Sequence, residues 1–250
     1  MRKITTFHVP TIDAGKARTE RQRQPAVTLS EQAYETIKNW IITCKFVPGE
    51  IIDEVSVAAL IGLGRTPVHH ALSRLNLEGL VDVIPRKGVI VTPIVPSLVM
   101  QLAETRLICE TQCAGLAAER ADATDVKKLR EILKAAQAAI RKRDVETMML
   151  KDREFHLTLA RASRNEYLTN IIGNLSEHSL RFWFISFTTD HHPRFQRQHE
   201  DIVEAVAAHS SDRAQAAMRK HLEMFRQNVE RQFEDGRPGA LAPGRISITA

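Results

Sequence analysis

Four side chains in the second half of the chain have the types and spacing of a metal site. Asp152 and His156 are four residues apart, so on a helix both project from one face about one turn apart. His199 and His221 lie on two later predicted helices. One carboxylate and three imidazoles suit zinc first, and also nickel, iron or manganese. With 10 histidines in the chain, several fall on helices by chance, so a surface position is the alternative for each.

We treat the histidines outside these patterns as bystanders; they are His8, His178, His191, His192 and His209. A metal-bound water held by such ligands could also serve hydrolysis, which makes a metal-dependent hydrolase-like bundle the alternative function. Two features argue against an enzyme. No Glu precedes a His by three residues, as paired di-metal motifs require. Glu154, the nearest candidate base, lies on the wrong helical face relative to Asp152.

A second group of polar residues surrounds a short predicted helix that begins at Thr66 and Pro67, a capping residue followed by the residue favoured at the first helical position. If this helix enters a DNA major groove, its first residues contact bases and its free N–H groups meet phosphate. Candidate side chains on this helix and on the following turn are Arg65, Thr66, His69, His70, Arg74, Arg86 and Lys87. The alternative is a helical hairpin with a few solvated surface cations.

The elements around this helix are those of a winged helix-turn-helix, over residues 28–94. Apolar residues recur at three- and four-residue spacing from Ser30 to about residue 47, over residues 57–61, and from Thr66 to Gly79. The period then changes to two on either side of Pro85-Arg86-Lys87-Gly88, which predicts a two-stranded hairpin.

The remainder shows only helical periodicity. We expect an all-α antiparallel bundle of six or seven helices over residues 97–234, so that the protein is mainly α. The predicted helices cover residues 97–121, 124–141, 144–162, 165–188, 193–208 and 212–234.

Charge and composition limit the alternatives. Residues 1–27 carry six Lys/Arg against two Asp/Glu and form a flexible basic arm, whereas residues 28–95 carry six against seven. A folded part with so little positive charge argues against a structural nucleoid protein. Residues 235–250, rich in Pro and Gly, form a flexible tail. Three cysteines without a CxxC pair, and no signal peptide or membrane-spanning run, predict a soluble cytoplasmic protein with reduced thiols.

The run GLGRTPVHHALSRLNLEGLV, followed by PRKGVIVTP, resembles the operator-binding domain of the GntR superfamily of bacterial regulators. The match includes Arg65, Thr66, Arg74 and the wing glycine, Gly88. The departures are Gly64 in place of the usual serine and His69-His70 in place of Arg-Glu. Since a histidine cannot make the bidentate contact of an arginine with guanine, the operator sequence or affinity should differ from the family norm.

The bundle is similar to the FCD effector domain of the FadR-type branch, in RLICETQCAGLAAERA, DREFHLTLARASRN and HEDIVEAVAAHSSDRAQAAMRKHL. The resemblance implies that Asp152, His156, His199 and His221 bind a divalent metal. It also implies that Arg106, in an R-x-x-x-E pattern with Glu110, and Asn165 face the effector. A surface ion pair for Arg106 and a helix N-cap for Asn165 are the structural alternatives.

The expected function is therefore a ligand-responsive transcriptional regulator rather than an enzyme. As a homodimer it would bind palindromic operator DNA, and a small organic acid held at the metal-containing bundle would release it. Repression is the more common role in the family, and no membrane partner is expected.

Overall fold

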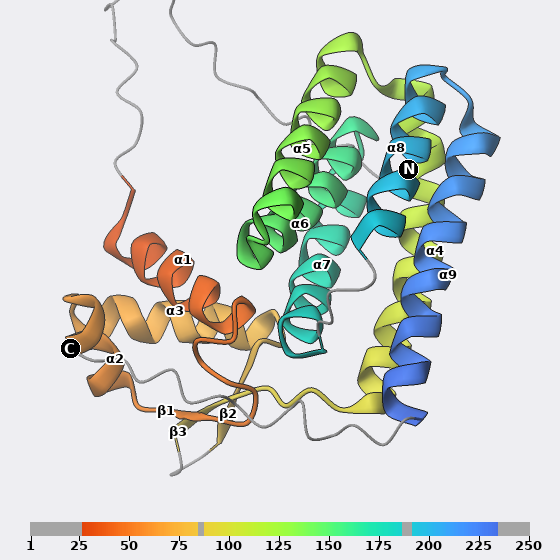
Figure 1. Cartoon of the computed structure of the whole chain (residues 1–250). Helices are drawn as coiled ribbons and strands as arrows, with labels where there is room; N and C mark the ends of the chain where they lie inside the picture. Colours follow the sequence, from red (N-terminus) through yellow and green to blue (C-terminus); the bar gives the residue numbers. More distant parts are fainter. Residues whose placement is uncertain (1–26, 85–87, 187–191, 235–250) are drawn as a thin grey trace, which may run out of the picture.

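In the computed structural model, residues 27–84, 88–186 and 192–234 are described. The N-terminal part contains three helices and a three-stranded sheet of strand order β1-β3-β2, with both pairings antiparallel (Figure 1). We call it the winged domain. Its elements are α1 (Leu29–Ile42), β1 (Ile51–Ile52), α2 (Glu54–Ile61), α3 (Arg65–Leu77), β2 (Val81–Ile84) and β3 (Gly88–Val91). The predicted helices and hairpin are confirmed, and β1 is an additional strand too short to show alternation.

Local capping explains where the first helices begin. The Thr28 hydroxyl accepts a hydrogen bond from the Glu31 backbone N–H at the start of α1. Asp53 does the same for Ser56 at the start of α2. Gly62 then ends α2 with a φ of 67°, a left-handed conformation that favours glycine. This turn changes the direction of the chain before α3, so that α2 and α3 form the helix-turn-helix.

The C-terminal part is a bundle of helices, drawn from yellow-green to blue in Figure 1. The described residues form six helices: α4 (Pro96–Arg120), α5 (Ala123–Lys142), α6 (Val145–Ala162), α7 (Glu166–Ser186), α8 (His192–Ala207) and α9 (Ser211–Glu234). Asp122 forms a capping box with Asp125 at the start of α5, and Asp144 caps α6. The predicted helical bundle is confirmed.

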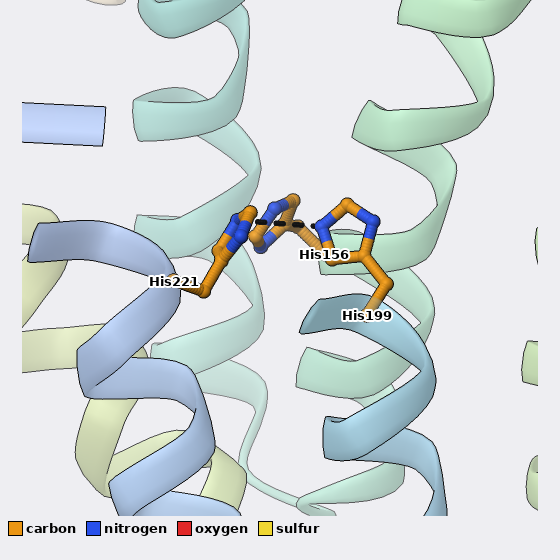
Figure 2. A group of neighbouring side chains, drawn as sticks. All are labelled: His156, His199 and His221. Carbon is orange, nitrogen blue, oxygen red and sulfur yellow. Dashed lines mark hydrogen bonds between the residues drawn. The ribbon is translucent and has the colours of Figure 1, made fainter. Parts of the chain in front are cut away.

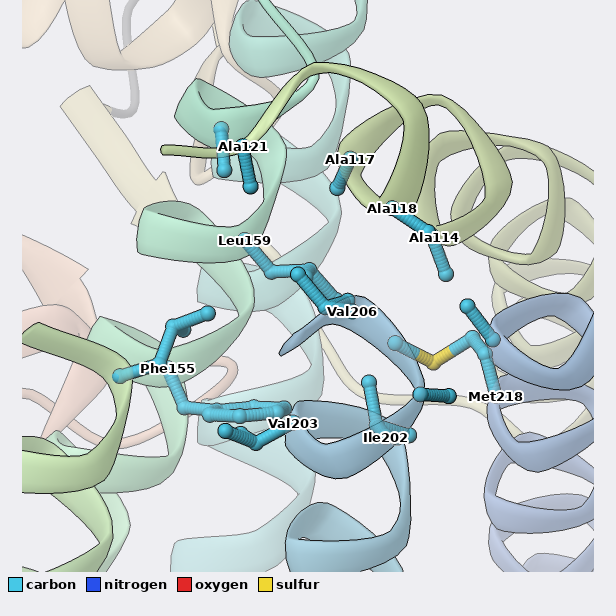
Figure 3. Close-up of a cluster of buried hydrophobic side chains, with 14 of the residues drawn as sticks. Ala114, Ala117, Ala118, Ala121, Phe155, Leu159, Ile202, Val203, Val206 and Met218 are labelled. Atoms are coloured by element: carbon cyan, nitrogen blue, oxygen red, sulfur yellow. The ribbon is translucent and has the colours of Figure 1, made fainter. Parts of the chain in front are cut away.

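One end of the bundle has an entirely apolar core, built by α4, α5, α6, α8 and α9 (Figure 3). Small residues on α4, among them Ala114, Ala117 and Ala118, are fully buried and leave room for the larger side chains opposite. Gly115 allows the closest approach of α9, since a Cβ atom there would lie 2.5 Å from Gln215 Nε2. This packing fixes the backbones of α6, α8 and α9 at this end of the bundle.

Helix α7 joins the bundle to the winged domain. Its Asn174 Nδ2 and His178 Nε2 each lie 3.0 Å from the backbone carbonyl oxygen of Glu78, the residue that caps the C-terminus of α3. Glu177 on the same helix forms a salt bridge of 2.6 Å with Lys38 of α1. His178, a bystander in the sequence analysis, therefore contacts the end of α3. None of the described helices is long and apolar enough to cross a membrane.

Candidate metal centre and nucleic-acid interface

Three histidines from three helices meet in the interior of the bundle. His156 of α6, His199 of α8 and His221 of α9 point toward one another in Figure 2, and each is no more than 4% exposed. One nitrogen from each ring can be chosen so that all three lie within 4.8 Å of one another. The structure thus brings together the three imidazoles selected from the sequence.

The spacing of two ring nitrogens fits a shared metal ion. His199 Nε2 and His221 Nε2 are 3.3 Å apart. Zinc–nitrogen bonds of about 2.0–2.1 Å at a tetrahedral angle place two ligand nitrogens about 3.3–3.4 Å from each other. A metal ion between these nitrogens therefore requires little movement of either ring.

Asp152 lies beside the three rings and is more exposed than they are. Its Oδ1 is 3.5 Å from His199 Nε2, and its Oδ2 is 4.0 Å from His156 Nε2. The Asp152 side chain is 35% exposed. A carboxylate in this position can complete a four-ligand set by a small rotamer change.

Burial keeps two of the imidazoles neutral. It lowers the pKa of His199 to about 4, with His156 and Arg106 acting in the same direction and Asp152 opposing them. Burial, followed by the neighbouring His199 and His156, also lowers the pKa of His221 well below its usual value. A neutral imidazole offers the lone pair that a metal ligand needs.

Two further polar residues contact the outer nitrogens of the rings. Glu110 Oε2 lies 2.5 Å from His156 Nδ1, and the Gln198 Oε1 atom lies 3.3 Å from His221 Nδ1. An oxygen at Nδ1 favours the tautomer that carries its hydrogen there, so that the Nε2 lone pair is the one offered to a metal. The sequence pairs Glu110 only with Arg106 and gives no indication of a role for Gln198. An acid or amide that contacts a histidine of another helix has no characteristic spacing in the sequence.

Arg106 and Glu110 form an ion pair, which was the structural alternative for Arg106, but in the interior rather than on the surface. Arg106 Nε is 2.5 Å from Glu110 Oε1, and both side chains are at most 3% exposed. Burial would raise the pKa of Glu110, but Arg106 and His156 outweigh it and hold that pKa at about 2. Arg106 Nη2 also lies 3.4 Å from His156 Nε2, so Arg106 adjoins the histidine cluster.

A cavity opens beside these groups and encloses about 710 Å³, including the part of its mouth that is open to solvent. Its polar lining consists of Arg106, Lys151, Asp152, Gln196, His199 and His221. Its apolar lining consists of Leu133, Ala136, Ile140, Met148, Met149, Phe155, Leu180, Trp183 and Phe225. A mixture of apolar walls and a few polar groups is typical of a small-molecule site.

Asn165, the other residue predicted to face the effector, does not line this cavity. Its Oδ1 accepts a hydrogen bond of 3.1 Å from the Leu168 backbone N–H at the start of α7. This is the N-cap geometry that the sequence analysis gave as the alternative.

The predicted DNA-contacting residues of α3 lie on its exposed side. Arg65, Thr66 and His70 are exposed at or near the N-terminus of the helix. Gly64 precedes the helix and supplies no side-chain cap, which leaves the first N–H groups available to a phosphate. Gly88, the wing glycine, is exposed with a φ of 102°, whereas Arg86 and Lys87 lie outside the described residues.

Two residues of this set also have partners within the winged domain. His69 Nδ1 is 3.0 Å from Glu54 Oε1. Arg74 forms a 3.0 Å salt bridge with Glu31, and its guanidinium carbon lies 3.5 Å from the centre of the Tyr34 ring. Arg74 thus helps to pack α3 against α1.

A winged helix-turn-helix joined to a helical bundle is the architecture of a DNA-binding regulator. The family "Bacterial regulatory proteins, gntR family" matches residues 29–91, and the FCD domain family matches residues 101–224. The chain belongs to the GntR family and is a transcriptional regulator of the FadR-type branch, with an N-terminal helix-turn-helix and a C-terminal FCD domain.

Its relatives are named as transcriptional regulators, not enzymes. It is 31% identical to the HTH-type transcriptional regulator LutR of Bacillus subtilis over 75% of this chain and 95% of LutR. It is 26% identical to the HTH-type transcriptional repressor RspR of Escherichia coli over 84% of this chain and 92% of RspR. The solved structure of E. coli McbR/YncC shares the fold, with a TM-score of 0.75 at 20% identity over 83% of this chain and 99% of that chain.

Proposed function

We propose that this regulator is a homodimeric repressor that holds one divalent metal ion per chain and leaves its operator when a small carboxylate binds beside the metal. The observation that carries this proposal is the meeting of three buried imidazoles and Asp152 at the wall of a cavity that also contains Arg106. Arg65, Thr66, His69, His70, Arg74 and Gly88 are the proposed DNA contacts in the described residues, with Arg86 and Lys87 proposed from the sequence.

The ligand set proposed for the metal is His156, His199, His221 and Asp152. Zinc is the first choice for three imidazoles and one carboxylate, and nickel, iron and manganese accept the same donors. When bound, such an ion supplies an electrophilic position that an outside carboxylate can occupy. Glu110 and Gln198 orient the rings of His156 and His221 through their Nδ1 atoms.

Charge balance favours an anionic effector. Glu110 already neutralises Arg106, and Asp152 contributes one further negative charge. A divalent cation added to these three groups leaves one net positive charge in a largely buried site. A carboxylate cancels that charge, whereas a neutral ligand leaves it without a counterion.

Operator release follows from the geometry of a dimer. Two recognition helices must lie about 34 Å apart to enter successive major grooves. A ligand that binds better to a form with another spacing lowers the affinity for the operator by its difference in affinity for the two forms.

The test uses full-length protein purified without an affinity tag and analysed for bound metals. We expect close to one divalent ion per chain in the wild type and loss of the ion in the His199→Ala/His221→Ala double variant. Metal-loaded protein is then titrated with acetate, malonate and malate, with binding heat as the readout, and release of an operator selected from random DNA is measured with longer carboxylates. A metal-free native protein, or equal binding heats for the wild type and the double variant, would overturn the proposal.

A further inference from the structure

The apolar part of the cavity lies directly against the DNA-binding part of the molecule. Met149 of α6 and Leu180 of α7 line the cavity and pack in one buried cluster with Ile42, the last residue of α1. Met148 and Trp183, which also line the cavity, pack against the same cluster. One layer of side chains therefore separates a molecule in the cavity from α1.

The same wall is displaced from the metal-binding groups along α6. Met148 and Met149 precede Asp152 by four and three residues, about one turn of helix, and Met149 precedes His156 by seven residues, about 10 Å. A carboxylate bound at the imidazoles would lie about two turns of α6 from Met149. An apolar body attached to this carboxylate would extend along the Met149–Leu180 wall.

Helix α7 provides a second connection from this wall to the recognition helix. Leu180 and Trp183 face the cavity, while His178 and Asn174 contact the Glu78 carbonyl at the end of α3. Arg181 Nη2 donates a hydrogen bond to the Thr92 carbonyl, just after β3. A shift of α7 away from the cavity would therefore displace its contacts with α1, with the end of α3 and with the wing.

We infer that the effector is an amphipathic carboxylate whose head is held at the metal end and whose apolar body pushes on Met148, Met149, Leu180 and Trp183, and that this apolar contact releases DNA. The inference rests on the proposed function and assigns separate roles to the two parts of the effector. The head group provides anchoring. The body provides the preference for the form with the shifted winged domain, because the body lies along the wall that α1 covers.

The test compares linear monocarboxylates of two, four, six and eight carbons on full-length, metal-loaded protein. Binding is measured by calorimetry, and the affinity for a selected operator is measured at a saturating concentration of each acid. We expect affinity to rise roughly fourfold for each buried methylene. Acetate at saturation should leave operator affinity unchanged, and octanoate should weaken it at least tenfold.

Variants separate binding from coupling. Ile42→Ala should bind octanoate as the wild type does but lose most of the operator response, with Ile42→Val intermediate. Ile171→Ala, the same truncation at an exposed position of α7, is the matched control and should respond normally. Hydrogen exchange at the ends of α1 and α3 should rise with octanoate in the wild type and stay unchanged in Ile42→Ala, a readout that does not require DNA.

The outcomes distinguish this inference from the proposal beneath it. Equal operator release by saturating acetate and octanoate would overturn the inference and leave the carboxylate-responsive regulator standing. A normal operator response in a folded Ile42→Ala variant would also overturn it. If none of the four acids binds the metal-loaded protein, the proposed function fails and the inference fails with it.

Discussion

The core of the winged domain consists of aliphatic and aromatic side chains, with the Tyr34 hydroxyl facing Glu78 at its edge. Those of its predicted functional residues that the structure describes are exposed. The bundle has an equally apolar core at one end, yet it also buries His156, His199, His221, Arg106 and Glu110. Burying such groups costs free energy unless every one is paired, and an apolar core of the same shape is often at least as stable. The bundle centre therefore contains polar groups that stability alone does not require, whereas the winged domain can change its surface without changing its core.

The largest effect should come from breaking the buried ion pair. Glu110→Ala leaves Arg106 buried without a counterion and removes the oxygen facing His156, which should lower the free energy of unfolding by about 3–5 kcal/mol. Urea unfolding of metal-free protein measures this loss. The control is Glu104→Ala, an exposed acid of the same helix, which should change stability by no more than about 0.5 kcal/mol. A Glu110→Ala variant as stable as this control would show that the buried charges are solvated.

Metal removal should have the next largest effect. An ion that binds only the folded protein stabilises it by about 2.7 kcal/mol when its free concentration is 100 times Kd. For a chain of this size, this corresponds to a decrease in Tm of roughly 5–11 °C on chelation. The His199→Ala/His221→Ala variant should show no such shift.

His178→Ala is the matched control for the metal experiment, since His178 lies outside the cluster and contacts Glu78. It should retain the full response to chelator even if it melts lower than the wild type. An identical melting curve for the wild type with and without chelator would indicate that the bundle centre binds no metal.

Much of this arrangement follows from the sequence because helical periodicity and capping are local. The helices containing His156, His199 and His221 end within a few residues of the predicted positions, so the three rings could be expected on neighbouring helices. The contacts of Glu110 with His156, and of Ile42 with Met149 and Leu180, join elements distant in the chain, and no spacing rule reports them. Asn165 is the opposite case. A helix N-cap can be recognised from the local sequence, and Asn165 caps α7, which was the alternative to its predicted effector role.

In the winged domain, we expect substitution of Arg65 to weaken DNA binding without changing the stability of the protein. If Arg65 contacts a base, Arg65→Ala should weaken binding to the selected operator by about 1–3 kcal/mol. Because the side chain is exposed, the free energy of unfolding should change by no more than about 0.5 kcal/mol. Anisotropy titrations at fixed salt measure the first quantity, and urea unfolding measures the second.

Lys87, which lies outside the described residues, provides the comparison for Arg65. If Lys87 contacts a phosphate, Lys87→Ala should weaken binding to all DNA sequences alike. Unchanged operator affinity in both variants would reject the proposed docking of α3.

The smallest effect should be found at Arg74, where the two kinds of role meet. Its guanidinium stacks on Tyr34 and pairs with Glu31, but the side chain is 49% exposed, so Arg74→Ala should lower the free energy of unfolding by only about 0.5–1 kcal/mol. Arg74→Lys retains the charge and loses the planar stack, so it should recover part of this stability. Since these contacts hold the guanidinium against α1, operator affinity should fall less than in Arg65→Ala. A loss of operator affinity as large as that of Arg65→Ala, with stability unchanged, would show instead that Arg74 leaves Tyr34 in the complex and contributes to DNA binding as much as Arg65.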